Sequence, residues 1–253
     1  MPFYDSHIHL ADKEYNYYLD DLVKSMKLMN IYAFCMSVDL ETSIKSMKIS
    51  HSNKHIYNFV GIHPEFAQTK QIENFINLIE NKIETIDGIG EIGLDYKYVQ
   101  DNEEYNQQRI VFGKMLELAE KYNKPISIHS RKSLTDVLEI INSYDIKRAV
   151  LHWFDGNKKQ LNIAMDMNLY VSYGPILLYS KDKKNLVKNS DKSKILVETD
   201  GPVRYANCFN YIPSSSTSCI VSVINCMSET LDIKFNDITN LLSNNSRMFI
   251  MQK

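Results

Sequence analysis

Short apolar runs alternate with longer amphipathic segments along most of the chain. The runs are rich in Ile, Val, Phe and Tyr and predict buried strands at residues 2–8, 31–38, 56–62, 86–92, 125–130, 147–153, 168–174 and 194–200. Apolar residues three and four positions apart predict helices at 19–29, 70–83, 106–122, 133–144, 218–231 and 236–250. In the fourth of these helices, Ser133 and Asp136 have the spacing of a capping box.

Eight strand–helix units favour a (β/α)₈ barrel of the TIM type over an open, doubly wound α/β sheet. No linker, repeat or low-complexity tract divides the sequence, so we expect a single domain over residues 1–253. In this fold the active site lies at the C-terminal ends of the strands. Those ends are where chemically competent side chains are expected.

Imidazole and carboxylate side chains gather at the ends of the predicted strands. His7 and His9 lie two positions apart, so they project to the same face of their strand. One histidine in an apolar strand is most often a hydrogen-bonded core residue, but so many together indicate metal ions, because unpaired buried charges cost several kcal/mol each. The full set is His7, His9, His63, Glu91, His129, His152 and Asp200.

The composition of this set suits divalent cations. Imidazole nitrogen and carboxylate oxygen without thiolate are typical ligands of Zn²⁺, Mn²⁺, Fe²⁺ or Ni²⁺, and carboxylate-rich positions also admit Mg²⁺. Six of the residues are candidate ligands, more than one catalytic zinc needs, and they match two ions that share a carboxylate. Glu91 is the expected bridge, in the stretch "GIGEIGLDY" (88–96), whose glycines let ligands crowd close to the strand.

Composition and charge narrow the class of protein. The hydrophobic fraction of 44% supports a sizeable core, and a net charge of −2 with a pI of about 6.4 leaves no footprint for coating nucleic acid. Neither a leader peptide nor a membrane span is recognisable, so we expect a soluble, cytoplasmic protein without a membrane partner. The cysteines Cys35, Cys208, Cys219 and Cys226 form no Cys-x-x-Cys pair and are expected to be buried free thiols.

Six short motifs resemble those of the TatD family of metal-dependent deoxyribonucleases. They are "DSHIHL", "GIHP", "GEIGLDY", "IHSR", "LHWFDG" and "VETDGP", in this order, from residue 5 to about residue 202. The ending "NNSRMFI" at 244–250 is also similar to that of the family. The resemblance implies a TIM barrel of the amidohydrolase-like superfamily with two divalent ions, of which Mg²⁺, Zn²⁺ and Mn²⁺ are the candidates.

The resemblance also implies roles for single residues. His7 and His9 would hold one ion with Glu91 and Asp200, whereas His129 and His152 would hold the second ion with Glu91. Asp200, Glu91 and His63 would be catalytic, with Asp200 orienting the attacking water and accepting its proton. His63 and Arg131 would contact the phosphate. The reaction would be hydrolysis of phosphodiester bonds in DNA or another nucleic acid, often from the 3′ end of single strands.

The sequence departs from the family pattern at the expected mouth of the barrel. Lys132 stands where an acidic residue is common, and Trp153 stands where a cysteine is common. The loop at 203–218 lacks the family's glutamate before Pro213. These changes remove no ligand, but they make the substrate less certain than the metal site.

Two basic segments have alternative interpretations. The loop offers Arg204 for substrate binding, and its aromatic residues Tyr205, Phe209 and Tyr211 are suited either to stacking bases or to packing on the barrel. The lysines of 181–194 fit either a polyanion track or the solvated face of a helix.

Two competing functions stay open. The same ions could hydrolyse another bond, such as an ester, an amide or a D-aminoacyl-tRNA linkage, because fold and site do not choose among electrophiles. A non-catalytic nucleic-acid-binding protein would have lost ligands and a basic surface, neither of which this sequence shows. The oligomeric state is left open.

Overall fold

The computed structural model describes residues 1–97, 99–205, 207 and 212–251. Its eight strands pair in parallel and in chain order. A bridge between Ile8 and Gly201 brings the first strand beside the segment after the last one, so the sheet forms a nearly closed barrel. The predicted (β/α)₈ fold is therefore confirmed. The strands are β1 (Phe3–Ile8), β2 (Ile31–Cys35), β3 (Ile56–Val60), β4 (Gly88–Gly93), β5 (Ile126–His129), β6 (Ala149–Leu151), β7 (Tyr170–Tyr173) and β8 (Ile195–Val197).

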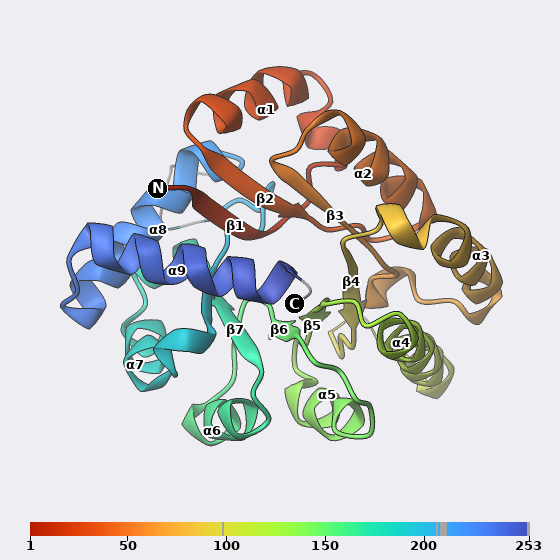
Figure 1. Ribbon diagram of the computed structural model, residues 1–253. Helices are drawn as coiled ribbons and strands as arrows, with labels where there is room; N and C mark the ends of the chain where they lie inside the picture. Colours follow the sequence, from red (N-terminus) through yellow and green to blue (C-terminus); the bar gives the residue numbers. More distant parts are fainter. Residues whose placement is uncertain (98, 206, 208–211, 252–253) are drawn as a thin grey trace.

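Helices surround the strands as an outer ring, and the last helix crosses one end of the barrel (Figure 1). Their order follows the chain, so each crossover returns the next strand parallel to the last. The helices are α1 (Leu19–Leu28), α2 (Leu40–Ser52), α3 (Ile72–Lys82), α4 (Asn102–Lys121), α5 (Leu134–Ile141), α6 (Lys158–Asp166), α7 (Lys181–Asn189), α8 (Ser216–Leu231) and α9 (Phe235–Ile250).

The helices α2 and α6 are absent from the sequence prediction. The buried face of α2 consists of Ser43, Ser46 and Ile49, and both serine hydroxyls donate to backbone carbonyls, so apolar spacing is weak there. In α6 only Leu161 and Ala164 are buried. Both helices begin with a capping box, which apolar periodicity alone does not detect.

The capping box predicted at Ser133 is wrong, although α5 does begin next to it. The Ser133 hydroxyl donates to the carbonyl of Leu94 at 2.6 Å, which ties the start of α5 to the end of β4. The carboxylate of Asp136 instead accepts hydrogen bonds from Tyr96 and Tyr105.

Strand residues alternate between two apolar cores. In β2, Ile31, Ala33 and Cys35 face the core between strands and helices. Phe34 belongs to the second core, which fills the barrel interior and includes Phe249 of α9. This alternation is the period of two that places successive side chains on opposite faces of a sheet.

Phe249 closes the N-terminal end of the barrel. Its ring lies 5.8 Å from Phe34, 6.3 Å from Phe59 and 5.4 Å from Tyr170 between centroids. Arg148, just before β6, donates to the carbonyl of Phe249 at 3.3 Å. The opposite, C-terminal end is thereby left as the open mouth of the barrel.

Three of the four cysteines, Cys35, Cys219 and Cys226, are buried free thiols as predicted, and Cys208 lies outside the described residues. Within the described part of the chain, no helix combines the length and the apolar character that crossing a membrane requires. The cytoplasmic location stays a prediction.

We expect Phe249→Ala to lower the free energy of unfolding by about 3–5 kcal/mol, because it opens a cavity among aromatic rings in the barrel interior. The neighbouring Met248 is 44% exposed, so Met248→Ala is the matched control and should change stability by less than about 1 kcal/mol. Chemical denaturation of the three proteins measures both values. Equal stability of the two variants would show that α9 does not seal the barrel through Phe249.

Candidate metal centre

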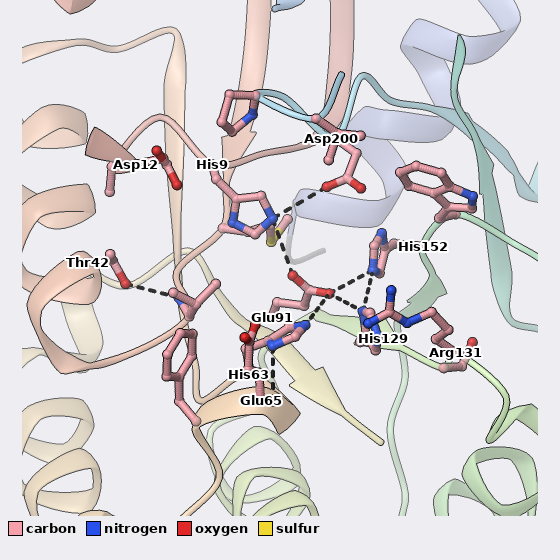
Figure 2. A pocket seen from close by; sticks show the side chains of 18 of the residues that line it. His9, Asp12, Thr42, His63, Glu65, Glu91, His129, Arg131, His152 and Asp200 are labelled. Carbon is pink, nitrogen blue, oxygen red and sulfur yellow. Dashed lines mark hydrogen bonds and ion pairs between the residues drawn. The ribbon is translucent and has the colours of Figure 1, made fainter. Parts of the chain in front are cut away.

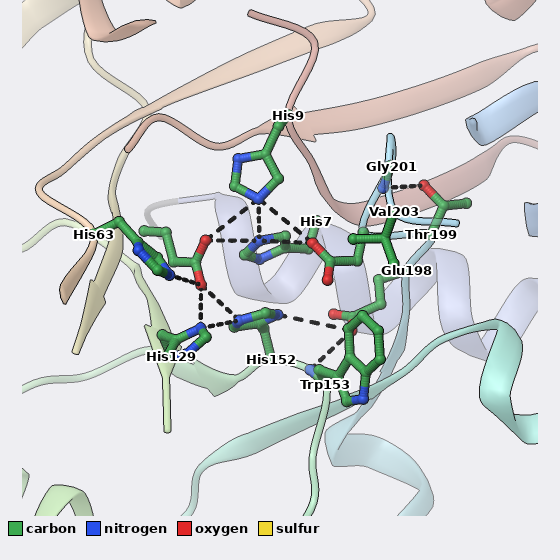
Figure 3. Close-up of polar contacts among 12 residues, drawn as sticks. His7, His9, His63, His129, His152, Trp153, Glu198, Thr199, Gly201 and Val203 are labelled. Atoms are coloured by element: carbon green, nitrogen blue, oxygen red, sulfur yellow. Dashed lines mark hydrogen bonds and ion pairs between the residues drawn. The ribbon is translucent and has the colours of Figure 1, made fainter. Parts of the chain in front are cut away.

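The seven predicted site residues converge at the C-terminal mouth of the barrel, around Glu91 (Figures 2 and 3). Two of them, His7 and Glu91, lie within strands, and His129 ends β5. The others follow their strands within a few residues, where the chain leaves the barrel wall: His9, His63, His152 and Asp200. Strand ends predicted from the sequence therefore position this group.

One carboxylate oxygen of Glu91 faces a first pair of imidazoles. The Nε2 atoms of His7 and His9 lie 3.2 Å apart, and each lies 3.3 Å from Glu91 Oε2. Asp200 Oδ1 lies 3.7 Å and 3.4 Å from the same two nitrogen atoms. Two imidazoles and two carboxylates thus direct ligand atoms at one small volume.

The other oxygen of Glu91 faces a second pair. His129 Nδ1 and His152 Nε2 lie 3.2 Å apart, and each lies 2.7 Å from Glu91 Oε1. Two imidazole nitrogens cannot both direct lone pairs at one carboxylate oxygen without a proton or a cation between them. The donor atoms on both sides of Glu91 therefore fit metal ions.

The pKa values of the site follow from burial and from these contacts. Burial disfavours a charged Glu91, yet His152, His63, His7 and His129 hold its pKa well below the usual range. Burial and the neighbouring His152 lower the pKa of His7 to about 4. For His9, burial is outweighed by Asp200 and Glu91, which raise its pKa to about 10.

The second pair has raised pKa values. Burial opposes the charged form of both rings, but Asp95 and Glu91 raise the pKa of His129, and Glu91 and Glu198 raise that of His152. Together with His9, these imidazoles carry the protons that compensate the buried carboxylates when no cation does so.

His63 presents Nε2 to the site, as His7, His9 and His152 do, but its other ring nitrogen accepts a hydrogen bond from the backbone. Its Nδ1 accepts a hydrogen bond from the backbone N–H of Glu65 at 3.1 Å, and burial lowers the pKa of His63 to about 3. A neutral imidazole that accepts at Nδ1 carries its proton on Nε2. His63 Nε2, 3.6 Å from Glu91 Oε1, is therefore a donor toward the site, which suits an oxyanion better than a metal ion.

Asp95 fixes the second pair from behind and is absent from the sequence prediction. It is fully buried, and its Oδ2 lies 2.6 Å from His129 Nε2. A carboxylate that accepts from one ring nitrogen leaves the other free to bind metal, so Asp95 directs the lone pair of His129 Nδ1 into the site. Arg131 Nε and Nη2 both lie 2.7 Å from the same oxygen, which places the predicted phosphate contact at the wall beside His129.

Asp5 positions Asp200 and is likewise absent from the prediction. Its carboxylate accepts hydrogen bonds from the backbone and hydroxyl of Thr199 at 2.9 Å and 2.6 Å and from Ser216. Burial raises the pKa of Asp5 to about 7 against these donors. Asp200 itself has a left-handed backbone with φ of 50°, and its N–H donates to the carbonyl of His7 at 2.9 Å.

Close backbone contacts explain part of the glycine framing of Glu91. Gly93 has φ of +144°, and a Cβ there would lie 2.1 Å from the carbonyl oxygen of His129. A Cβ on Gly61 would lie 2.7 Å from the carbonyl oxygen of Glu91. Side chains at these positions would push the neighbouring strands and their ligands apart.

The other basic and aromatic residues considered for substrate binding have different positions in the structure. Arg204 pairs with Glu14 of the short helix η1 (Lys13–Tyr15) and is not among the described residues that line the central cavity. Tyr205 is buried and packs on the barrel, whereas Phe209 and Tyr211 lie outside the described residues.

The lysine run at 181–194 forms α7 and the turn after it. Lys183 of this run is buried, and its Nζ donates to the carbonyl of Phe154 and to Asp155. Lys183 thus anchors the loop after β6 and is neither solvated nor placed to track a polyanion.

A cavity of about 640 Å³ opens above the metal centre. It is lined by His9, His63, Glu91, His129, His152 and Asp200 on its floor, with Phe66, Trp153 and Val203 among the apolar wall residues. The size suits a small part of a polymer or a compact small molecule.

A family model described as TatD related DNase matches residues 4–251. The chain belongs to this family. Human deoxyribonuclease TATDN3 is 26% identical over 211 residues, which cover 78% of this chain and 77% of the relative. The uncharacterized metal-dependent hydrolase YabD of Bacillus subtilis is 26% identical over 250 residues, covering 96% and 97%. A putative deoxyribonuclease TATDN1 homolog of Enterocytozoon bieneusi is 33% identical over 193 residues, covering 72% and 68%.

Solved structures of the TatD family share the fold. The TatD homolog YjjV of Escherichia coli superposes with a TM-score of 0.89 at 20% identity and covers 98% of this chain and 97% of its own. A TatD family hydrolase of Entamoeba histolytica gives 0.85 at 21% identity, with 100% and 99% covered. The family model over residues 4–251 confirms the predicted family, and the chain is a metal-dependent hydrolase of the TatD type.

In this TatD-family chain, we expect Asp95→Ala to weaken metal binding about 10- to 100-fold, because His129 loses the partner that fixes its tautomer. Asp155→Ala is the matched control, since Asp155 lines the same cavity but pairs with Lys183 rather than with a histidine of the centre. Chelator competition with Zn²⁺ or Mn²⁺ measures the dissociation constants. An unchanged constant in Asp95→Ala would refute the orienting role.

Metal binding should also release protons, and its affinity should rise with pH. The pKa values of His9, His129 and His152 are raised, so these rings hold protons more tightly than a free imidazole does, and a metal ion must displace those protons. His7 and His63, whose pKa values are lowered, should contribute none.

Titration calorimetry of Zn²⁺ in two buffers of different ionisation enthalpy counts these protons. Exposed His51 of α2 does not line the cavity and supplies the control His51→Ala, which should release as many protons as the unchanged protein. A pH-independent affinity would contradict the assignment of these histidines as ligands.

Proposed function

We propose that the protein is a deoxyribonuclease that hydrolyses phosphodiester bonds with two divalent cations, one on each side of Glu91. The observation that carries this proposal is the division of the Glu91 carboxylate, in which each oxygen contacts its own pair of converging imidazole nitrogens. A single ion would leave one of these pairs unexplained.

The residues sort into two ligand sets. His7, His9 and Asp200 would hold one cation with Glu91 Oε2, and His129 and His152 would hold the other with Oε1. Four imidazoles with two carboxylates suit Zn²⁺ or Mn²⁺ better than Mg²⁺, which prefers oxygen ligands. When bound, two such cations lower the pKa of a water molecule and offset the negative charge of a phosphodiester.

The chain's own residues supply positioning and proton transfer. Asp200 lines the cavity and is held by Asp5 and Thr199 through the segment before it, so it is placed to orient the attacking water and to take its proton. The Nε2–H of His63 would donate a hydrogen bond to a phosphate oxygen. Arg131, fixed by Asp95, would add a charged donor at the cavity wall.

Arg204 would have a more distant role than predicted. Because it pairs with Glu14 outside the cavity lining, it would meet a bound strand some distance from the scissile bond. The substrate contact proposed for Arg204 therefore lies outside the cavity that His63 and Arg131 line.

Two observations support DNA as the substrate class. Relatives over most of the chain carry the name deoxyribonuclease or putative deoxyribonuclease. The proposed ligand arrangement also suits in-line displacement at phosphorus. We also propose a cytoplasmic location and cleavage from the 3′ end of single strands, as expected from the sequence and the family resemblance.

We expect Glu91→Gln to reduce hydrolysis of single-stranded DNA by at least about 100-fold, since changes behind the ligands alone cost about 10- to 100-fold. Glu65→Gln is the matched control, because Glu65 lines the same cavity but its side chain is assigned no ligand role, and its activity should stay near that of the unchanged protein.

Initial rates on single-stranded DNA, single-stranded RNA, bis-p-nitrophenyl phosphate and p-nitrophenyl acetate give the comparison. Turnover of the carboxylic ester alone would reject the nuclease in favour of a hydrolase of another bond. Full activity with full metal occupancy in Glu91→Gln would reject the shared bridge.

A further inference from the structure

Trp153 is the only tryptophan of the sequence, and it lies directly after His152 at the metal centre. It is partly exposed and lines the central cavity, as do Asp200, Pro202 and Val203. Figure 3 shows its indole ring close to Glu198 and His152. The mechanism proposed above gives this side chain no role.

The indole is held in place by contacts on its backbone and on its ring. The backbone N–H of Trp153 donates to Glu198 Oε1 at 2.8 Å, and the other oxygen of this fully buried carboxylate accepts from Ser172. The contact with Glu198 holds Trp153 in a left-handed conformation with φ of 44°. Such a conformation is uncommon for a bulky residue and persists only where its surroundings enforce it.

The ring itself stacks on Tyr205, with centroids 5.5 Å apart and an interplanar angle of 23°. Tyr205 is buried, and its hydroxyl donates to the carbonyl of Thr199 at 2.8 Å. Thr199 immediately precedes Asp200, so the aromatic pair and the proposed general base share one support. The exposed part of Trp153 is therefore rigid before any substrate arrives.

The charges around the cavity exclude a simple phosphate track. Among the described lining residues, Arg131 is the single lysine or arginine, and it already pairs with Asp95. Carboxylates stand elsewhere on the wall at Asp12, Glu65 and Asp155. Within this described lining, the bases of nucleotides beside the scissile phosphate therefore have better partners than their phosphates.

We propose that Trp153 is a stacking platform for the nucleobase next to the phosphodiester that the metal centre cleaves. A base reaches such a platform only when it is unpaired, so this contact selects single strands and frayed ends. The proposal rests on the proposed nuclease function and names the part of the substrate that the site recognises. Trp153 acts here as a specificity-determining residue and takes no part in the chemistry.

Tryptophan fluorescence tests the contact directly. Trp153 is the only tryptophan of the sequence, so selective excitation of tryptophan reports on this residue alone. The metal-loaded protein is titrated with a phosphorothioate oligothymidylate, which resists hydrolysis, and with an abasic strand of the same backbone. We expect saturable quenching by the first strand and little by the second. Equal quenching and equal affinity for the two strands would overturn the proposal.

Kinetics supply the second measurement. Trp153→Ala should raise KM for single-stranded DNA about 5- to 150-fold with a small change in kcat, the range that loss of one base–aromatic stack gives. Trp153→Phe should restore most of the affinity, and neither variant should alter turnover of an abasic strand with ordinary phosphodiester bonds, which has no base to stack and also shows that the variants are folded. Tyr17→Ala is the control, since Tyr17 is 99% exposed and does not line the cavity.

The outcomes separate the two proposals. If the unchanged protein cleaves normal and abasic strands equally well and Trp153→Ala matches it, the stacking platform is wrong and the nuclease stands. If the protein hydrolyses neither the strands nor bis-p-nitrophenyl phosphate, the proposed function is wrong, and the stacking platform that rests on it is wrong as well.

Discussion

The carboxylate of Glu91, shared between two pairs of imidazoles, is the interaction on which the rest of this structure depends. A buried carboxylate costs several kcal/mol unless charges and hydrogen bonds compensate it, and here Glu91 is 2% exposed. The compensation requires histidines from β1, β5 and the segment after β6 to meet at one point. The nearly closed ring of parallel strands brings their C-terminal ends together in this way.

Buried carboxylates behind the ligands maintain this geometry. Asp95 sets the tautomer of His129, Asp5 holds the Thr199 segment that carries Asp200, and Glu198 holds the backbone of Trp153 beside His152. Each belongs to a strand or to the residues just beyond one. The proposed metal ligands are therefore supported by a second set of polar side chains that is equally buried.

The fold and the convergence of the candidate ligands were predictable because both depend on local patterns. Apolar runs located the strands, and residue type at their ends located His7, Glu91 and His129. The supporting carboxylates were not predictable in this way. Asp95 lies in the quoted stretch "GEIGLDY", but only the folded chain shows that it reaches His129 from two residues beyond β4.

Helix α2 was missed for a similar reason, since its buried face is formed by serine hydroxyls that bond to backbone rather than by apolar side chains. The central claim is that Glu91 bridges two cations. The most direct test is a crystal structure of the metal-loaded protein with anomalous scattering recorded at the absorption edge of the bound metal. The account predicts two anomalous peaks, one beside His7 and His9 and one beside His129 and His152, with one Glu91 oxygen on each. A single peak, or two peaks of which Glu91 touches only one, would contradict it.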